Sequence, residues 1–337
     1  MTIKLKPLDQ QVIVITGASS GIGLVTARTA AARGAKVMLV ARSGDELGDI
    51  VRDINNAGGT ADFVAADVGD ADALAEAAAA ARQRFGRIDT WVNNAGVAIY
   101  AKLLDTPEDE HQQMFRTNYF GAVHGCLAAV PALKEQGGAL ITVGSIASDI
   151  ASPVMGAYAA SKHAVQAYVQ SLRIELKTMA PNVSVTLVKP AGIDTPIAQH
   201  AANHEGGEAQ IPPPVYDPQI VADTILDCAV HPRREITIGG IGRAQVLFAE
   251  HFPALFEWLA PLTTKGLTDK SKPQPRPDNL ATAVRTGEER SGEYPNAMKN
   301  SIYTSAARHP KTTAAIVGGG VLAATALLFA NRRRSKG

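Results

Sequence analysis

Short apolar runs rich in β-branched residues alternate with longer, alanine-rich stretches from Val12 to about Ile238. Continuous apolar runs of about four to eight residues are typical of strands buried on both faces of a parallel sheet. The pattern predicts seven such strands, at Val12–Thr16, Lys36–Ala41, Ala61–Ala66, Thr90–Asn93, Ala139–Gly144, Val183–Lys189 and Glu235–Ile238.

Stretches of helical length lie between these strands. A chain in which strands and helices alternate forms a parallel sheet with helices on both sides. We therefore expect one doubly wound α/β domain, Rossmann-like, over residues 8–240. The predicted helices include Gly21–Arg33, Ala71–Phe85, Pro107–Leu133, Gly156–Met179 and Pro218–Val230.

The pattern changes after residue 240, because Leu, Phe and Trp crowd into residues 244–262 around Pro253. We predict an apolar helical extension over residues 241–262, which packs on the domain or forms a lid over the substrate cleft. A helix lying on a membrane surface is the alternative. Residues 263–312 are polar and interrupted by prolines, which is typical of a linker or a loosely ordered arm.

Residues 314–330 carry no charge and precede a basic tail at 332–337. At about 1.5 Å per residue they reach roughly 26 Å, just short of the ~30 Å hydrocarbon core of a bilayer. A full span would carry the basic tail outward, against the positive-inside tendency. For the helix predicted at 313–331 three interpretations stay open. They are membrane contact, packing against another helix within an oligomer, and a tail whose helical pattern is incidental.

Charge and cysteine content narrow the function classes. A net charge of +1 gives no electrostatic reason to expect nucleic acid as a partner. Cys126 and Cys228 are the only cysteines, too few for a disulfide framework or a thiolate metal site. We therefore expect no metal. The first eleven residues lack the apolar stretch of a signal peptide, so a cytoplasmic catalytic domain is expected.

A glycine-rich turn, Thr16-Gly17-Ala18-Ser19-Ser20-Gly21-Ile22-Gly23, follows the first predicted strand and opens the first predicted helix. Glycines permit a tight turn and a close approach of backbone to a ligand. The free N–H groups and the positive dipole end of the helix suit a pyrophosphate. In this context the motif predicts a dinucleotide-binding site.

The second predicted strand ends in Ala41-Arg42-Ser43. An acidic residue at this place would accept hydrogen bonds from a ribose 2′-hydroxyl and favour NAD. A guanidinium beside a serine hydroxyl instead suits a 2′-phosphate, because Arg pairs with phosphate at fixed geometry. The sequence therefore favours NADP over NAD, with an ordinary surface charge as the alternative for Arg42.

Tyr158 and Lys162 are spaced Y-x-x-x-K within a predicted helix, so their side chains lie one turn apart on the same face. A lysine ammonium held there stabilises phenolate. It lowers the pKa of the tyrosine from about 10 towards the working range of a general acid or base. The pair is therefore a candidate catalytic centre.

Together with further motifs in the same order, these features resemble the short-chain dehydrogenase/reductase family over roughly residues 8–240. The further motifs are Asp67-Val68 after the third strand, Asn93-Asn94-Ala95-Gly96 after the fourth, Asn118 in a helix and Ser145 after the fifth strand. The resemblance implies an oxidoreductase that transfers a hydride between NADP(H) and a carbonyl or secondary alcohol. It also implies a homo-oligomer.

The resemblance assigns catalytic roles to four residues. Tyr158 would donate a proton to the carbonyl oxygen, and Ser145 would hydrogen-bond the same oxygen. Lys162 would lower the pKa of Tyr158 and bind the nicotinamide ribose. Asn118 would hold a water through which a proton returns from solvent.

The resemblance also assigns cofactor contacts along the carboxyl edge of the sheet. Asp67 would hydrogen-bond the adenine amine, and Val68 would pack beside the ring. Positions matching 190, 193 and 195 hold the nicotinamide carboxamide. The expected cofactor-binding residues are Gly17, Ser19, Ser20, Gly21, Ile22, Gly23, Arg42, Asp67, Val68, Asn94, Ala95, Gly96, Tyr158, Lys162, Pro190, Ile193 and Thr195.

One departure from the family pattern follows the sixth strand, where Pro190-Ala191-Gly192 replaces the usual Pro-Gly. Alanine restricts the backbone, so the turn geometry and the mobility of the following loop depend on how it is accommodated. The family resemblance implies that this loop, 194–216, grips the substrate with Val154, Met155 and residues 97–100. The apolar C-terminal segments favour a lipophilic substrate such as a steroid, retinoid or fatty carbonyl.

Two alternative functions stay open. One is an NAD-dependent alcohol dehydrogenase of the same fold, which would differ in its use of Arg42. The other is a non-catalytic, nucleotide-binding membrane scaffold. The intact set of Asn118, Ser145, Tyr158 and Lys162 argues against the scaffold.

Overall fold

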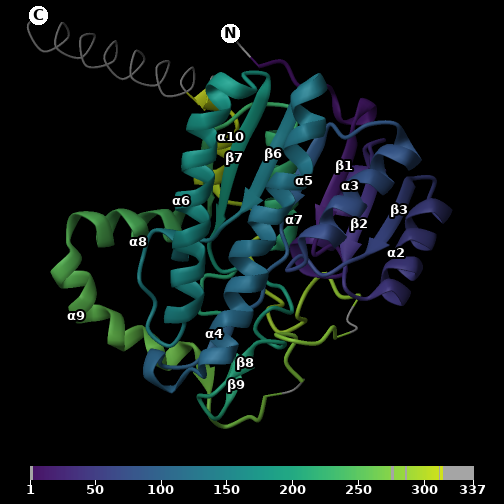
Figure 1. Cartoon of the computed structure of the whole chain (residues 1–337). Coiled ribbons are helices and arrows are strands. Elements are labelled where there is room, and N and C mark those ends of the chain that lie inside the picture. The colour runs from purple at the N-terminus through teal and green to yellow at the C-terminus, as the bar shows by residue number, and fades with distance from the viewer. Residues whose placement is uncertain (1–2, 275–276, 285–286, 311, 314–337) are drawn as a thin grey trace, which may run out of the picture.

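The computed structural model describes residues 3–274, 277–284, 287–310 and 312–313. Its centre is a sheet of seven strands in the order β10-β7-β6-β4-β1-β2-β3, all paired in parallel (Figure 1). The predicted doubly wound α/β architecture is confirmed. The strands are β1 (Val12–Thr16), β2 (Lys36–Ala41), β3 (Thr60–Ala65), β4 (Thr90–Asn93), β6 (Gly138–Val143), β7 (Val183–Pro190) and β10 (Glu235–Ile238).

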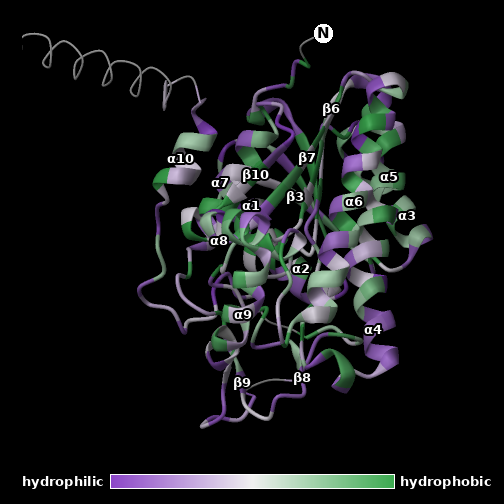
Figure 2. Ribbon diagram, turned by 90° about the vertical axis from the view of Figure 1, so that its left-hand side faces the viewer, coloured by the Kyte–Doolittle hydropathy of each residue, from purple (hydrophilic) through white to green (hydrophobic). Residues whose placement is uncertain are grey.

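Helices cover both faces of the sheet (Figure 2). One buried cluster joins the sheet to α1, α2 and α7, and a second joins it to α3, α5 and α6. The sheet is thus apolar on both sides, which is why its strands appear in the sequence as unbroken apolar runs. The helices are α1 (Gly21–Ala32), α2 (Gly44–Asn56), α3 (Ala71–Phe85), α4 (Glu108–Phe115), α5 (Gly121–Gln136), α6 (Gly156–Met179) and α7 (Pro218–Cys228).

Two helices differ from the sequence prediction. The single helix expected over Pro107–Leu133 is divided into α4 and α5 by a π-helical turn at Arg116–Phe120. The helix α2 was not predicted, although its buried residues Leu47, Ile50 and Ile54 recur at helical spacing. Most of its other positions are polar or charged, and this polarity hides the short apolar stripe.

The carboxyl ends of the strands form the functional edge of the sheet. The strand order reverses between β1 and β4, and ligands of such sheets bind in the crevice at this point. Two small strand pairs, β5 (Ile99–Tyr100) with β8 (Ala202–Asn203) and β9 (Glu208–Ala209) with β11 (Thr268–Asp269), extend this edge. They lie at the bottom of the molecule in Figure 1.

The apolar extension forms two helices, α8 (Gly240–His251) and α9 (Pro253–Thr263), which pack against each other and project from the domain (Figure 1). Phe248, Phe256 and Leu259 line a cavity at the carboxyl edge of the sheet. Trp258 and Leu262 are exposed. The extension therefore has the placement that a lid over the substrate cleft requires, while its boundary as a separate unit stays a prediction.

The segment expected to be a linker is packed against the domain instead. We call its described residues 277–284 and 287–301 the C-terminal arm. Leu280 is buried, and Met298 pairs with the backbone of Val215 and Asp217. Arg290 donates two hydrogen bonds to the Asp217 carboxylate, at 3.1 and 2.9 Å. The polar residues of the arm thus find partners on the domain, and α10 (Ile302–Arg308) then packs beside β10.

No helix within the described ranges is both long enough and apolar enough to cross a membrane. The uncharged stretch 314–330 and the basic tail 332–337 lie outside the described residues. The expectation of membrane contact through 314–330 therefore stays a prediction.

Candidate active site

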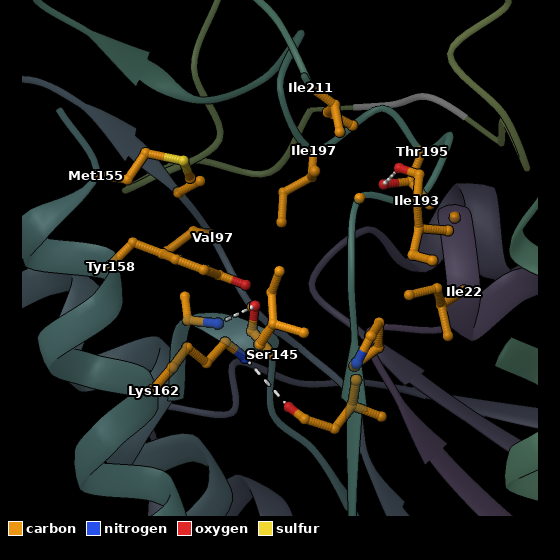
Figure 3. Close-up of a pocket in the computed structure, with 18 of the residues that line it drawn as sticks. Ile22, Val97, Ser145, Met155, Tyr158, Lys162, Ile193, Thr195, Ile197 and Ile211 are labelled. Atoms are coloured by element: carbon orange, nitrogen blue, oxygen red, sulfur yellow. Dashed lines mark hydrogen bonds between the residues drawn. The ribbon is translucent and has the colours of Figure 1, made fainter. Parts of the chain in front are cut away.

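A cavity of about 610 Å³ opens at the carboxyl edge of the sheet and runs from the glycine turn to α8 and α9. Its size is in the range of sites that bury a small-molecule ligand. Figure 3 shows Tyr158, Lys162 and Ser145 on one wall and Ile22, Ile193 and Thr195 on the other.

The glycine turn is held rigidly against the end of β4. The Thr16 hydroxyl accepts hydrogen bonds from the backbone of Asn94 and Ala95, at 3.0 and 3.2 Å. The Asn94 amide donates to the carbonyls of Thr16 and Gly17, at 3.0 and 3.2 Å. A Cβ on Gly23 would lie 2.1 Å from the Gly17 oxygen, so only glycine fits there. Gly23 therefore shapes the turn and does not line the cavity.

Arg42, Ser43 and Asp67 line the end of the cavity beside β2 and β3. Ser43 precedes α2, but its hydroxyl makes no cap bond to that helix. Burial lowers the pKa of Arg42, and the nearby charge of Asp67 opposes this effect. The Asp67 carboxylate accepts a hydrogen bond from the Gly69 backbone at 2.9 Å, which fixes the turn after β3. This end has the donors and acceptors that an adenosine would need.

Tyr158 and Lys162 project from α6 into the cavity (Figure 3). The side chains of Tyr158 and Ser145 lie close together on this wall, and hydrogen bonding by Ser145 acts to lower the pKa of the phenol. The Lys162 ammonium lies 5.6 Å from the centre of the Tyr158 ring and donates to the Val143 carbonyl at 3.1 Å. Ser145 caps a short 3-10 turn at Ile146–Ser148, because its hydroxyl accepts from the Ala147 backbone at 3.1 Å. The phenol of Tyr158, the ammonium of Lys162 and the hydroxyl of Ser145 therefore lie on the same wall of the cavity.

Burial dominates the protonation of this pair. It raises the pKa of Tyr158 to about 12, although the hydrogen bond with Ser145 acts in the other direction. It lowers the pKa of Lys162 to about 8. The sequence predicted a lowered tyrosine pKa, and this prediction is wrong, because burial raises the pKa. The cost of burying a charged phenolate exceeds the opposing effect of hydrogen bonding by Ser145.

Asn118 occupies the π-helical turn between α4 and α5. Its side-chain oxygen accepts from the Val97 backbone at 2.8 Å. Its amide donates to the Val97 carbonyl and the Ser161 hydroxyl, both at 3.0 Å. Asn118 therefore fixes the Val97 loop to α6 and does not itself line the cavity. Such π-helical turns occur often at functional sites.

The turn after β7 accommodates Ala191 without strain. Its N–H donates to the Ile238 carbonyl at 2.9 Å. In the described part of the chain, Val154 is the one non-glycine residue with positive φ, at 68°. The methyl group of Ala191 would lie 2.7 Å from a Cβ on Gly242, so this alanine packs tightly on the start of α8. Pro190, Ile193 and Thr195 line the cavity as expected.

The other half of the cavity has apolar walls. Val97, Met155, Ile197 and Ile211 line it, as expected from the sequence (Figure 3). Residues that the sequence did not single out join them. These are Ile146 and Ile150 after β6, Ile241, Phe248, Phe256 and Leu259 of α8 and α9, and Asn279, Ala283 and Val284 of the C-terminal arm. The aromatic run at 244–262 was a signal for the second group, whereas the arm carries no motif.

Most expected site residues come together at this one cavity. All of the expected catalytic and cofactor-binding residues except Asn118 and Gly23 line it, and Val154, expected to contact the substrate, does not. Within the described residues, no cluster of three His, Cys, Asp or Glu could hold a metal ion.

Comparison with known proteins agrees with this geometry. A family model described as short chain dehydrogenase matches residues 11–206. An uncharacterized oxidoreductase of Bacillus subtilis (strain 168), YxnA, is 39% identical over 322 residues, which are 94% of this chain and 90% of the relative.

Two solved structures are similar over about three quarters of the chain. A short-chain dehydrogenase/reductase from Burkholderia phymatum in complex with NAD has a TM-score of 0.67 and 27% identity, over 74% of this chain and 96% of its own. A short chain dehydrogenase from Burkholderia cenocepacia J2315 in complex with NADP has a TM-score of 0.64 and 26% identity, over 76% and 99%. The chain belongs to the short-chain dehydrogenase/reductase family and is an NAD(P)-dependent oxidoreductase.

Proposed function

We propose that this protein interconverts a carbonyl group and a secondary alcohol on a neutral, apolar substrate, with NADP(H) as its cofactor. The observation that carries the proposal is the meeting of Tyr158, Ser145 and Lys162 in the cavity that also contains the glycine turn. When bound, NADP(H) supplies or accepts the hydride, and the protein supplies position and a proton.

Tyr158 acts as the acid in the reductive direction. Its raised pKa, about 12 because of burial, keeps the proton on the phenol at neutral pH. The phenol can then donate this proton to a carbonyl oxygen as negative charge develops there. Ser145, held at the start of its 3-10 turn, donates a second hydrogen bond to the same oxygen.

Lys162 and Asn118 support the return of the proton. A Cβ on Gly96 would lie 3.6 Å from the Lys162 ammonium and 3.4 Å from the Asn118 side-chain oxygen. Glycine at 96 therefore leaves a space between these two groups, and we assign this space to a relay water. The pKa of Lys162, lowered to about 8 by burial, suits a group that exchanges protons near neutral pH.

Arg42 supports NADP(H) as the cofactor. It lines the cavity together with Ser43, whose hydroxyl is not used to cap α2. A guanidinium and a hydroxyl at the end of β2 are suited to a 2′-phosphate. The similar structures hold NAD in one case and NADP in the other, so the choice depends on this chain's own residues.

The walls of the cavity support a neutral substrate. Among the described residues that line it, the Lys, Arg, Asp and Glu side chains are Arg42, Asp67 and Lys162, all in the cofactor half or the catalytic centre. A charged substrate group would be buried against the apolar half without a partner, which is costly. A lipophilic ketone, aldehyde or secondary alcohol fits these walls.

The test is a panel of carbonyl compounds reduced with NADPH or with NADH. We expect NADPH to be preferred, kcat/KM to rise with the apolar size of the substrate, and charged keto acids to be poor substrates. A preference for NADH would support the NAD-dependent alternative. Absence of turnover with both cofactors across the panel would support the non-catalytic scaffold.

We also propose that two copies of the chain pair through α5 and α6. Phe120 lies just before α5 and Leu127 within it, and both are exposed; Ile174 and Met179 are exposed on α6 of the same sheet face. Burial of such side chains favours association. A Leu127→Glu variant should reduce the mass measured by light scattering to that of one chain, and an unchanged mass would exclude this interface.

A further inference from the structure

The side chain expected to bind the 2′-phosphate is held by the C-terminal arm. Arg42 Nη1 donates to the carbonyls of Leu280 and Ala281, at 3.4 and 3.1 Å. Its Nη2 donates to the carbonyls of Asn279 and Thr282, the second at 3.2 Å. Four consecutive carbonyls of the arm therefore converge on one guanidinium.

The arm is anchored at this place by more than Arg42. Leu280 is buried in a cluster with Val97, Ile99 and Met114. The Gln113 amide donates to the Leu280 carbonyl at 3.2 Å, and the Asn279 N–H donates to the His200 carbonyl at 2.9 Å. The position of residues 279–282 is thus fixed by an apolar contact and by backbone bonds on both sides.

A second stretch of the arm crosses the glycine turn itself. The Gly21 N–H donates to the Glu288 carbonyl at 2.8 Å. Beyond it, the Ser291 N–H donates to the Asp194 carboxylate at 3.0 Å, next to Thr195 in the predicted nicotinamide contact. The arm therefore lies across the cofactor half of the cavity at both the Arg42 end and the turn.

Nη1 and Nη2 of Arg42 carry four N–H groups, and four carbonyls accept hydrogen bonds from them. The donors that would bind a phosphate are therefore already hydrogen-bonded to the arm. A 2′-phosphate could bind Arg42 fully only by replacing them. Carbonyl oxygens left beside a doubly charged phosphate would also repel it. A ribose 2′-hydroxyl does not need to replace these carbonyls at Arg42, and it carries no charge for them to repel.

We propose that residues 279–282 are a cofactor-specificity determinant, whose carbonyls compete with the 2′-phosphate of NADP(H) for Arg42. Binding of NADP(H) releases this stretch of the arm, whereas NAD(H) binds with it docked. The inference rests on the proposed role of Arg42. Because linked equilibria are reciprocal, any change that weakens docking of the arm must strengthen NADP(H) binding.

The experiment measures dissociation constants of NADPH and NADH for the full chain by nicotinamide fluorescence. In a Leu280→Asp variant, which places a charge in the apolar anchor, we expect NADPH to bind about tenfold more tightly and NADH to change by less than about twofold. Leu280→Ala, a milder change, should shift NADPH binding in the same direction. Ile302→Asp is the matched control, because Ile302 is exposed at the start of α10, the helix that follows the arm and packs beside β10.

An Arg42→Ala variant separates failure of this inference from failure of the proposed cofactor. If Arg42→Ala leaves the NADPH-to-NADH ratio unchanged, the proposed preference for NADP(H) is wrong. If Arg42→Ala weakens NADPH binding but both Leu280 variants bind NADPH as the wild type does, the competition is overturned.

Hydrogen exchange of the peptide 277–284 gives a direct readout. NADP⁺ should increase its exchange, because the Asn279 N–H loses its bond to His200 when the stretch is released. NAD⁺ should leave the exchange unchanged or lower it. Equal protection of this peptide by both cofactors would overturn the proposal.

Discussion

The Lys162 ammonium lies 5.6 Å from the centre of the Tyr158 ring and is held there by its hydrogen bond to the Val143 carbonyl. Removing only the phenolic oxygen leaves this arrangement intact. We therefore expect Tyr158→Phe to lower kcat by about 10³-fold while the dissociation constant of NADPH changes by less than about twofold. Tyr168→Phe is the control on the same helix, because Tyr168 packs against Tyr119 and does not line the cavity. Equal loss of rate and cofactor binding in Tyr158→Phe would indicate a structural role.

Burial of the charged Lys162 ammonium lowers the free energy of unfolding by an amount that depends on pH. Its folded-state pKa of about 8 lies below the ordinary 10.5, so the unfolded chain holds an extra proton between these values. The contribution of Lys162 to the free energy of unfolding therefore rises as pH increases from about 8 to 10.5. At pH 7, Lys162→Met should be inactive but about 1–3 kcal/mol more stable. Urea unfolding at pH 7 and pH 10 measures the difference in the free energy of unfolding between Lys162→Met and the wild type. This difference should be smaller at pH 10. An equal difference at both pH values would contradict the burial argument.

Gly23 and Gly48 offer a matched pair of glycine substitutions. A Cβ at Gly23 would meet the Gly17 oxygen at 2.1 Å, whereas one at Gly48 in α2 would meet Phe63 at an ordinary 3.7 Å. Gly23→Ala should weaken NADPH binding at least tenfold by deforming the turn. Gly48→Ala should bind normally and gain about 0.5–1 kcal/mol of stability from helix propensity. Normal cofactor binding by Gly23→Ala would refute the assigned turn geometry.

A buried ion pair supports the segment that follows Ser145. The Lys189 ammonium lies 2.8 Å from one Asp149 carboxylate oxygen and donates to the other at 3.1 Å, with Glu235 further away at 3.6 Å. Lys189→Met should cost about 3 kcal/mol, because it leaves a carboxylate without its partner. The double variant Lys189→Met/Asp149→Leu should recover part of the loss. Thermal unfolding of both variants checks this, and additive losses would mean that the two groups are not coupled.

Local pattern was enough to predict much of the fold. Strands such as β1 and β2 are apolar throughout because helices cover both faces of the sheet, so their boundaries are visible in the sequence. The Tyr158–Lys162 contact is equally local, since four residues along one helix place both side chains on one face. The helix α2 was missed because its apolar stripe is narrow among charged residues.

The sequence by itself therefore determined the fold, the family and most of the motif residues that line the cavity, since these depend on short-range periodicity and on side chains with distinctive chemistry. Tertiary structure alone decided that burial, and not Lys162, sets the protonation of Tyr158. It also decided that the C-terminal arm lies on Arg42 and on the glycine turn. Those contacts use backbone carbonyls more than 200 residues away in the chain, which every amino acid possesses and no sequence motif can mark.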